Sequence, residues 1–167
     1  MIHVYTGPMF ASKTTRLLSC IERESYRVTC KDALLLIKHS IDGRHGERTV
    51  GTHHGIVRHA TVTTDALAKV NRGDLEGVEA ICVDEGQFFA DLAETCLDWK
   101  DRGIKVYVAC LDLDSLRKPW ENVAKLLCYA DTVEKCTAVC ECKRDATVTY
   151  RSTSAEGRIS VGDADKY

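Results

Sequence analysis

The sequence predicts an α/β fold in which helices flank a parallel β-sheet. The run at residues 33–38, ALLLIK, is apolar up to its final lysine, as expected for a strand buried on both faces, and the runs at 79–85 and 105–112 resemble it. A β-branched and aromatic run at residues 2–6 leads into a glycine-containing loop. Stretches of helical period occupy residues 15–24, 64–70, 88–100 and 120–129. Strands that alternate with helices are typical of a parallel sheet covered by helices.

Composition and charge exclude several classes of protein. A chain of 167 residues is long enough for one sizeable core with a small appendage. Its 23 basic and 25 acidic side chains give a net charge of -2, so nothing predicts a nucleic-acid or membrane partner. The apolar runs are too short to span a bilayer, and the first residues do not form a signal peptide. We therefore expect a cytoplasmic protein.

The cysteines fall into two groups. We expect the isolated ones to be small buried hydrophobes: Cys20, Cys30, Cys82, Cys96, Cys110 and Cys128. Cys136, Cys140 and Cys142 cluster within a short segment, which in a cytosolic chain favours metal binding over disulfide formation. This cluster, with the polar and β-prone sequence around it, predicts a small β-rich appendage after Asp131.

The loop after the first strand resembles a phosphate-binding loop, whose pattern is G-x-x-x-x-G-K-[ST]. Gly7, Lys13 and Thr14 match that pattern, and Ser12 stands at the second glycine. A strand–loop–helix unit directs backbone N–H groups and the positive helix end at a phosphate, Lys13 adds a charge, and Thr14 offers a hydroxyl to Mg²⁺. If position 12 needs a positive φ, serine costs about 1–3 kcal/mol. We expect weakened but retained nucleotide binding; an ordinary turn before a helix is the alternative.

Two adjacent acids end the strand at 79–85. Asp84 is placed to act with Mg²⁺, and Glu85 is placed to accept the proton of a hydroxyl acceptor during phosphoryl transfer. Phe88 and Phe89 follow and offer flat surfaces for a ring. Ligands of open α/β sheets bind beyond the carboxyl ends of the strands, where both motifs lie.

These motifs occur together in a known order. GPMF-x-x-KTT, IK-x-x-x-D-x-R (37–44), DEGQFF (84–89), RKPW (117–120), TAVC (137–140) and GDADKY (162–167) resemble the landmarks of type II deoxythymidine kinases from Tyr5 to Tyr167. The resemblance implies transfer of the γ-phosphate of ATP to the 5′-hydroxyl of thymidine. It implies a P-loop (RecA-like) domain over residues 1–133. A zinc-ribbon-like lobe with a lasso loop would occupy 134–167, truncated at its C-terminus.

The resemblance also implies roles for individual residues. Glu85 would be the catalytic base, and Thr14 and Asp84 would serve Mg²⁺. The residues implied at ATP or its phosphates are Gly7, Pro8, Met9, Ser12, Lys13, Thr14, Thr15, Asp42 and Arg44. For the last two, a charged surface loop is the alternative. The residues implied at the nucleoside are Met9, Phe88, Leu111, Trp120, Thr149, Gly162 and Tyr167. Residues 149–167 would be the lasso, whose backbone hydrogen bonds would reject cytosine.

The chain departs from the family pattern at several ligand contacts. Ser12 replaces a glycine, Ser115 stands where an aromatic residue is expected, and Asp163 replaces a lasso glycine. The first zinc pair is C-x-C, at Cys140 and Cys142, in place of C-x-x-C, and no cysteine or histidine follows. Structural zinc needs four nitrogen or sulfur ligands, so a zinc site and a turn of reduced thiols are both open.

Two hypotheses for function follow. The retained acids and P-loop favour a working thymidine kinase, whereas the changes at ligand contacts favour a degenerate copy that is a structural or regulatory partner of an active subunit. A P-loop ATPase acting on nucleic acid is disfavoured by the near-neutral charge. The resemblance further implies a homotetramer and feedback inhibition by thymidine triphosphate.

Overall fold

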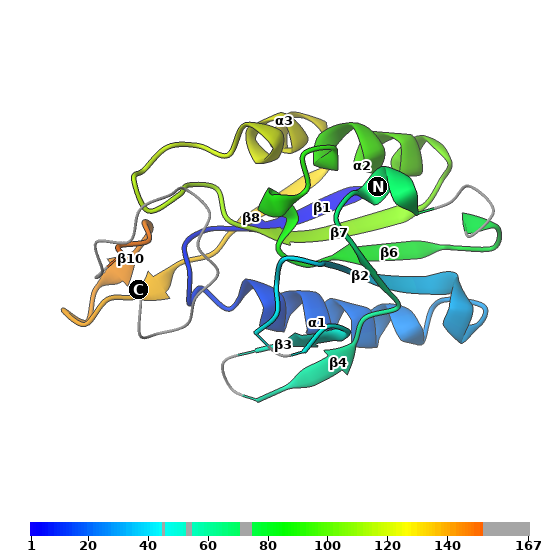
Figure 1. The fold of residues 1–167 in the computed structure, drawn as a ribbon, viewed down its shortest axis with the longest axis horizontal. Helices are drawn as coiled ribbons and strands as arrows, with labels where there is room; N and C mark the ends of the chain where they lie inside the picture. The colour runs from blue at the N-terminus through cyan, green and yellow to red at the C-terminus, as the bar shows by residue number, and fades with distance from the viewer. Residues whose placement is uncertain (45, 53–54, 71–74, 152–167) are drawn as a thin grey trace.

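The computed structural model describes residues 1–44, 46–52, 55–70 and 75–151. Its main sheet has the strand order β5-β2-β6-β7-β1-β8, and every pair of neighbours is parallel. The strands are β1 (Ile2–Thr6), β2 (Leu34–His39), β5 (Val62–Thr64), β6 (Ala80–Val83), β7 (Lys105–Cys110) and β8 (Thr132–Lys135). Helix α1 (Lys13–Ser25) covers one face, and α2 (Leu92–Asp101) and α3 (Glu121–Tyr129) cover the other (Figure 1). The predicted fold class is confirmed.

Burial on both faces explains the continuous apolar strands. In β6, Ile81 belongs to the core on the side of α2 and Cys82 to the core on the side of α1, and both are fully buried. Trp99 of α2 fills the first core, and Leu17 of α1 fills the second. Alternate residues of the same strand therefore enter different cores, so no position on it can be polar without cost.

The expected helices are partly right. Residues 15–24 are helical as predicted, and the helix expected at 120–129 forms from Glu121 to Tyr129. The helix expected from 88 begins at Leu92 because a 3₁₀ turn, η4 (Gly86–Phe88), precedes it. The helix expected at 64–70 is wrong. Its first residue ends β5, and a single turn, η2 (Leu67–Lys69), follows. The carboxylate of Asp91 accepts hydrogen bonds from the N–H groups of Leu67 and Ala68 at 3.2 and 2.7 Å. These bonds pair the N–H groups at the start of the turn, which have no partner within it.

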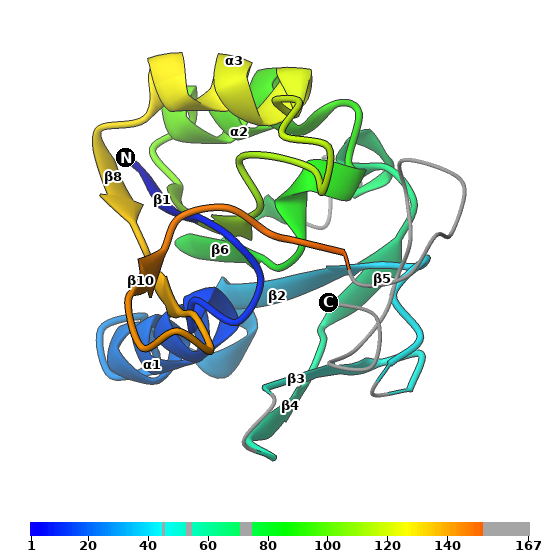
Figure 2. The ribbon, with the colours of Figure 1, turned by 90° about the vertical axis from the view of Figure 1, so that its left-hand side faces the viewer.

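In the described part of the chain, two hairpins accompany the main sheet. β3 (Thr49–Gly51) pairs with β4 (Val57–His59), which the sequence did not indicate, and β9 (Ala138–Val139) pairs with β10 (Asp145–Ala146) inside the expected β-rich segment. Strand β8 pairs with β1 through Lys135, two residues past the expected boundary at 133. The division into 1–133 and 134–167 stays a prediction. Figure 2 shows the β9–β10 hairpin beside the loop that joins β1 to α1.

The isolated cysteines behave as expected at four of six positions. Cys20, Cys82, Cys96 and Cys110 are buried, and burial raises the pKa of each thiol. The expectation is wrong for the others, which are exposed: Cys30 and Cys128. Cys30 precedes the 3₁₀ turn η1 (Lys31–Ala33) that leads into β2, and Cys128 lies in the last turn of α3. None of the described helices has the length and apolar character needed to cross a membrane.

Candidate active site

The loop between β1 and α1 has the backbone of a phosphate-binding loop. Ser12 immediately precedes the helix with φ 58° and ψ 23°, in the left-handed region that the glycine of the motif normally occupies. The condition for strain at this position is therefore met. Lys13 folds back over the loop, and its Nζ donates to the Pro8 carbonyl at 2.5 Å. Burial lowers the pKa of Lys13, and the charges of Glu85 and Asp84 oppose that shift.

The end of β1 is closed from the other side by the C-terminal segment. Gly7 has φ 137°, and a Cβ at this position would lie 2.3 Å from the Cys136 carbonyl oxygen. The Cys136 N–H donates to the Thr6 carbonyl at 2.7 Å. Two residues into the loop, the Met9 N–H donates to Thr149 Oγ1 at 3.0 Å. Met9 and Thr149, both expected at the nucleoside, therefore lie together.

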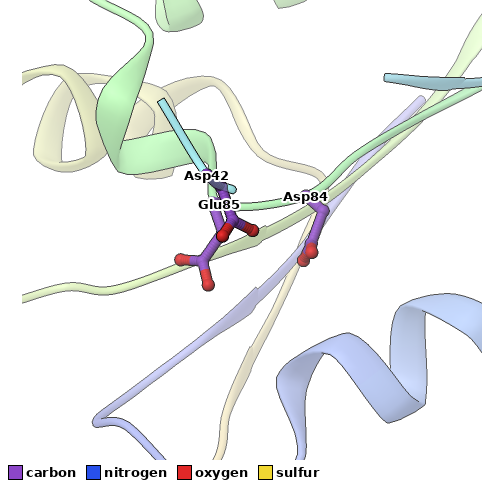
Figure 3. A group of neighbouring side chains, drawn as sticks. All are labelled: Asp42, Asp84 and Glu85. Atoms are coloured by element: carbon purple, nitrogen blue, oxygen red, sulfur yellow. The ribbon is translucent and has the colours of Figure 1, made fainter. Parts of the chain in front are cut away.

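Three acidic side chains converge beside the loop. The carboxylates of Asp42, Asp84 and Glu85 have ligand oxygens within 4.8 Å of one another (Figure 3). Asp84 directly follows β6, and Asp42 lies in the loop after β2. The Thr14 hydroxyl donates to Asp84 Oδ1 at 3.0 Å. The two residues predicted from sequence to serve Mg²⁺ are thus in contact.

The charges of these acids are compensated unequally. Burial opposes ionisation of Asp42, but hydrogen bonds from Arg44 at 2.7 and 3.1 Å outweigh it and lower the Asp42 pKa. Arg44 also forms an ion pair with Glu85. Asp84 is buried and accepts a hydrogen bond from the Thr14 hydroxyl, and burial and the nearby Glu85 charge outweigh that bond and the Arg44 charge and raise its pKa to about 7. A cation bound beside Asp84 would therefore favour its ionised form.

Glu85 is held from both sides. Its backbone is left-handed, with φ 52°. Oε1 faces Arg44, and Oε2 accepts a hydrogen bond of 2.6 Å from Gln87 Nε2. The other end of the Gln87 amide, Oε1, accepts the Leu111 N–H at 2.9 Å. Sequence reasoning did not single out Gln87, although its place in the DEGQFF motif was a signal.

An aromatic surface borders this group. The Phe88 and Trp120 rings meet edge to face with centroids 6.2 Å apart, and His39 approaches Phe88 at 5.8 Å. Asn122 Nδ2 donates to the carbonyls of Gln87 and Phe89 at 3.0 and 2.6 Å, and so fixes η4. Phe88 and Trp120, expected at the nucleoside, are therefore brought together, and the hydrogen bond to Gln87 places Leu111 near them.

Three groups of predicted site residues remain: Thr15, the lasso residues and the cysteine cluster. Thr15 lies in the first turn of α1, half-buried. Gly162, Asp163 and Tyr167 fall outside the described residues. Cys140 and Cys142 lie exposed in the turn between β9 and β10, whereas Cys136 is buried. Over the described ranges, the acidic group around Asp84 brings three ligand atoms together, and the cysteine cluster does not.

Comparisons with known proteins agree with one another. The family model described as thymidine kinase matches residues 1–167. The chain is 36% identical to a thymidine kinase of Fowlpox virus over 99% of this chain and 91% of that protein. It is 36% identical to a thymidine kinase of Mesomycoplasma hyopneumoniae over 100% of this chain and 90% of that protein. A thymidine kinase of Oryza sativa subsp. japonica is 38% identical over 99% of this chain and 62% of its own length.

Proposed function

The chain belongs to the thymidine kinase family, and from this premise we propose that it transfers the γ-phosphate of ATP to the 5′-hydroxyl of thymidine. The observation that carries the proposal is the convergence of a P-loop with two adjacent acids, of which Asp84 is buried. Lys13 and Thr14 come from the start of α1, and Asp84 and Glu85 come from the end of β6, yet Thr14 and Asp84 share a hydrogen bond. Phosphoryl transfer needs this combination of phosphate cradle, metal-associated carboxylate and base.

The loop would bind the phosphates of ATP. The backbone between Gly7 and Ser12 leads into the N-terminus of α1, where unpaired N–H groups and the helix dipole favour an anion. Lys13, now bonded to the Pro8 carbonyl, would exchange that bond for the phosphate oxygens. Arg44 forms an ion pair with Glu85, so its guanidinium lies where it could also contact a phosphate group transferred beside Glu85. This supports the proposal that Arg44 binds a phosphate of ATP.

The donor set fits Mg²⁺. Hydroxyl and carboxylate oxygens are ligands that this ion prefers, and Thr14 and Asp84 offer one of each in direct contact. The raised pKa of Asp84 marks buried charge that a cation would compensate. We propose that these two residues hold Mg²⁺, which, when bound with ATP, neutralises charge that builds on the phosphates.

Glu85 would be the general base. The 5′-hydroxyl proton passes to its carboxylate as the 5′-oxygen forms its bond to the γ-phosphorus, and the bond to the leaving oxygen of ADP breaks. Both carboxylate oxygens already accept a hydrogen bond or ion pair, yet each retains a further lone pair for the hydroxyl. Phe88, Leu111 and Trp120 would line the pocket of the thymine ring, with Met9 and the lasso from Thr149 completing it.

From the family resemblance we further propose that the protein is a cytoplasmic homotetramer that acts in nucleotide salvage and is inhibited by thymidine triphosphate. A zinc site is not part of it. Tetrahedral zinc needs four ligands, and the described residues bring no third ligand to the exposed pair Cys140 and Cys142. The residues described therefore do not fit a closed zinc centre.

The test is phosphate transfer from Mg-ATP to thymidine by the parent and by Glu85→Gln. We expect turnover by the parent and a loss of about 100-fold or more in kcat on removal of the base. Glu94→Gln is the matched control, because Glu94 is an exposed acid on α2 that pairs with Lys125. An inert parent, or a Glu85→Gln variant with full kcat, would refute the proposal, and the first outcome would support the noncatalytic copy.

A further inference from the structure

We propose that Gln87 is the positioning residue of the catalytic base: it holds the Glu85 carboxylate at a fixed place relative to the nucleoside pocket. The inference rests on the proposed function, in which Glu85 accepts the 5′-hydroxyl proton. Gln87 is 2% exposed, and both ends of its side-chain amide are engaged. One end contacts the base and the other contacts Leu111, a residue proposed to line the pocket.

The orientation of the Gln87 amide follows from the chemistry of its partners. The backbone N–H of Leu111 can only donate, so the amide oxygen must face it. The amide NH₂ must then face Glu85, where it meets Oε2 at 2.6 Å. A flipped amide would set oxygen against carboxylate and NH₂ against N–H, and both contacts would be repulsive. Gln87 therefore presents a donor to the base in one orientation only.

The backbone around Gln87 is fixed independently of its side chain. Asn122 Nδ2 bonds the carbonyls on either side of Phe88 and so holds η4. A Cβ on Gly86 would lie 2.7 Å from Val108 Cγ1, so the turn is pressed closely onto β7. Glu85, by contrast, has a strained left-handed backbone and a side chain whose other partner is Arg44. The hydrogen bond from Gln87 therefore ties the Glu85 carboxylate to a rigid turn.

Without the hydrogen bond from Gln87, the Glu85 carboxylate would be displaced toward Arg44. Arg44 is itself held by Asp42 through two hydrogen bonds, so it would draw the free carboxylate toward the loop after β2. A general base works only within hydrogen-bonding distance of its proton, and small displacements in an active site lower the rate steeply. Loss of Gln87 should therefore reduce kcat and leave ATP binding at the P-loop intact.

The first experiment compares the parent with Gln87→Met, which keeps the length and volume of the side chain and removes both hydrogen bonds. We expect kcat to fall about 10-fold to 100-fold, the range for a hydrogen bond to a charged group, with the KM for ATP changed less than about twofold. Thr52→Val is the matched control. Thr52 is buried and accepts the Ile56 N–H at 3.1 Å in the β3–β4 hairpin, so Thr52→Val removes a buried hydrogen bond away from the site at nearly constant side-chain volume.

A double-mutant cycle separates positioning from a structural role. Glu85→Asp keeps a carboxylate but withdraws it from the reach of Gln87. If Gln87 acts through Glu85, adding Gln87→Met to Glu85→Asp changes kcat by less than about twofold, and equal losses in both backgrounds would overturn the inference. Should Gln87→Met not fold, Gln87→Glu takes its place. It can still accept the Leu111 N–H but sets a carboxylate against Glu85, and unchanged kcat in that variant would also overturn the inference.

The two levels fail differently. If the parent does not phosphorylate thymidine, or Glu85→Gln retains full kcat, the proposed function fails. If the parent is active and Glu85→Gln is not, while Gln87→Met keeps the parental kcat, only the positioning role of Gln87 fails.

Discussion

Substitution of Gly7 by alanine tests how the phosphate loop is joined to the rest of the fold. Gly7 has φ 137°, and an added Cβ would lie 2.3 Å from the Cys136 carbonyl oxygen and 3.1 Å from its carbon. The positive φ costs about 1–3 kcal/mol for a non-glycine residue, and the backbone contact adds about 1–3 kcal/mol as an overpacked site. We therefore expect Gly7→Ala to lower the free energy of unfolding by about 4 kcal/mol, a large share of the usual total.

Gly103→Ala provides the matched control. Gly103 also has a positive φ, 84°, but a Cβ there would meet no heavy atom within 4 Å. Its substitution should cost only the backbone strain, about 1 kcal/mol after the gain from a less flexible unfolded chain. Urea unfolding followed by tryptophan fluorescence measures both variants. Equal losses in the two variants, at an unchanged m-value, would refute the argument that the Cys136 carbonyl closes on Gly7.

Two further predictions concern single side chains. Ser12→Gly should raise the free energy of unfolding by about 0.5 kcal/mol, because relief of the left-handed strain exceeds the entropy that glycine adds to the unfolded state. A lower free energy of unfolding for Ser12→Gly than for the parent in a urea titration would contradict this prediction. Burial alone would raise the pKa of Glu24, but bonds from Lys105 and Arg27 outweigh it and lower the pKa. Its contribution to stability is therefore present above the unfolded pKa of about 4.3 and is lost as pH falls through the lower folded value. Glu24→Gln should lack this acid-dependent loss, and parallel urea midpoints for both proteins below pH of about 4.5 would contradict it.

The sequence correctly predicted the elements whose own apolar pattern shows which of their residues are buried. The apolar runs that became β2, β6 and β7 are buried on both faces, and α1 and α3 present a clear apolar stripe. Where an element depends on a distant partner, the prediction was wrong. The segment from Thr64 to Val70 has a helical period, but its first residue pairs with β2 and Asp91 caps a single turn.

The site follows the same rule. The phosphate loop and the acids were visible because each motif is contiguous, and the contact between Thr14 and Asp84 followed from the shared edge of a parallel sheet. The compensation of the acids was not visible. Arg44 bonds Asp42 in its own loop but also reaches Glu85, which is 41 residues away in sequence. Gln87 joins Glu85 to Leu111 only because β6 and β7 are neighbours in the sheet.

Strain at Ser12 is sustained because the backbone of its loop is fixed on both sides, by the segment from Cys136 to Thr149 and by the start of α1. At the start, the Cys136 N–H donates to the Thr6 carbonyl, and the Cys136 carbonyl packs against Gly7. Inside the loop, Thr149 Oγ1 accepts the Met9 N–H, and at the end α1 begins at Lys13. A residue in a sparsely populated conformation persists when its surroundings determine the backbone on both sides. The segment from Cys136 to Thr149 is therefore a structural part of the phosphate loop, which explains how a serine can occupy the position of the motif's glycine.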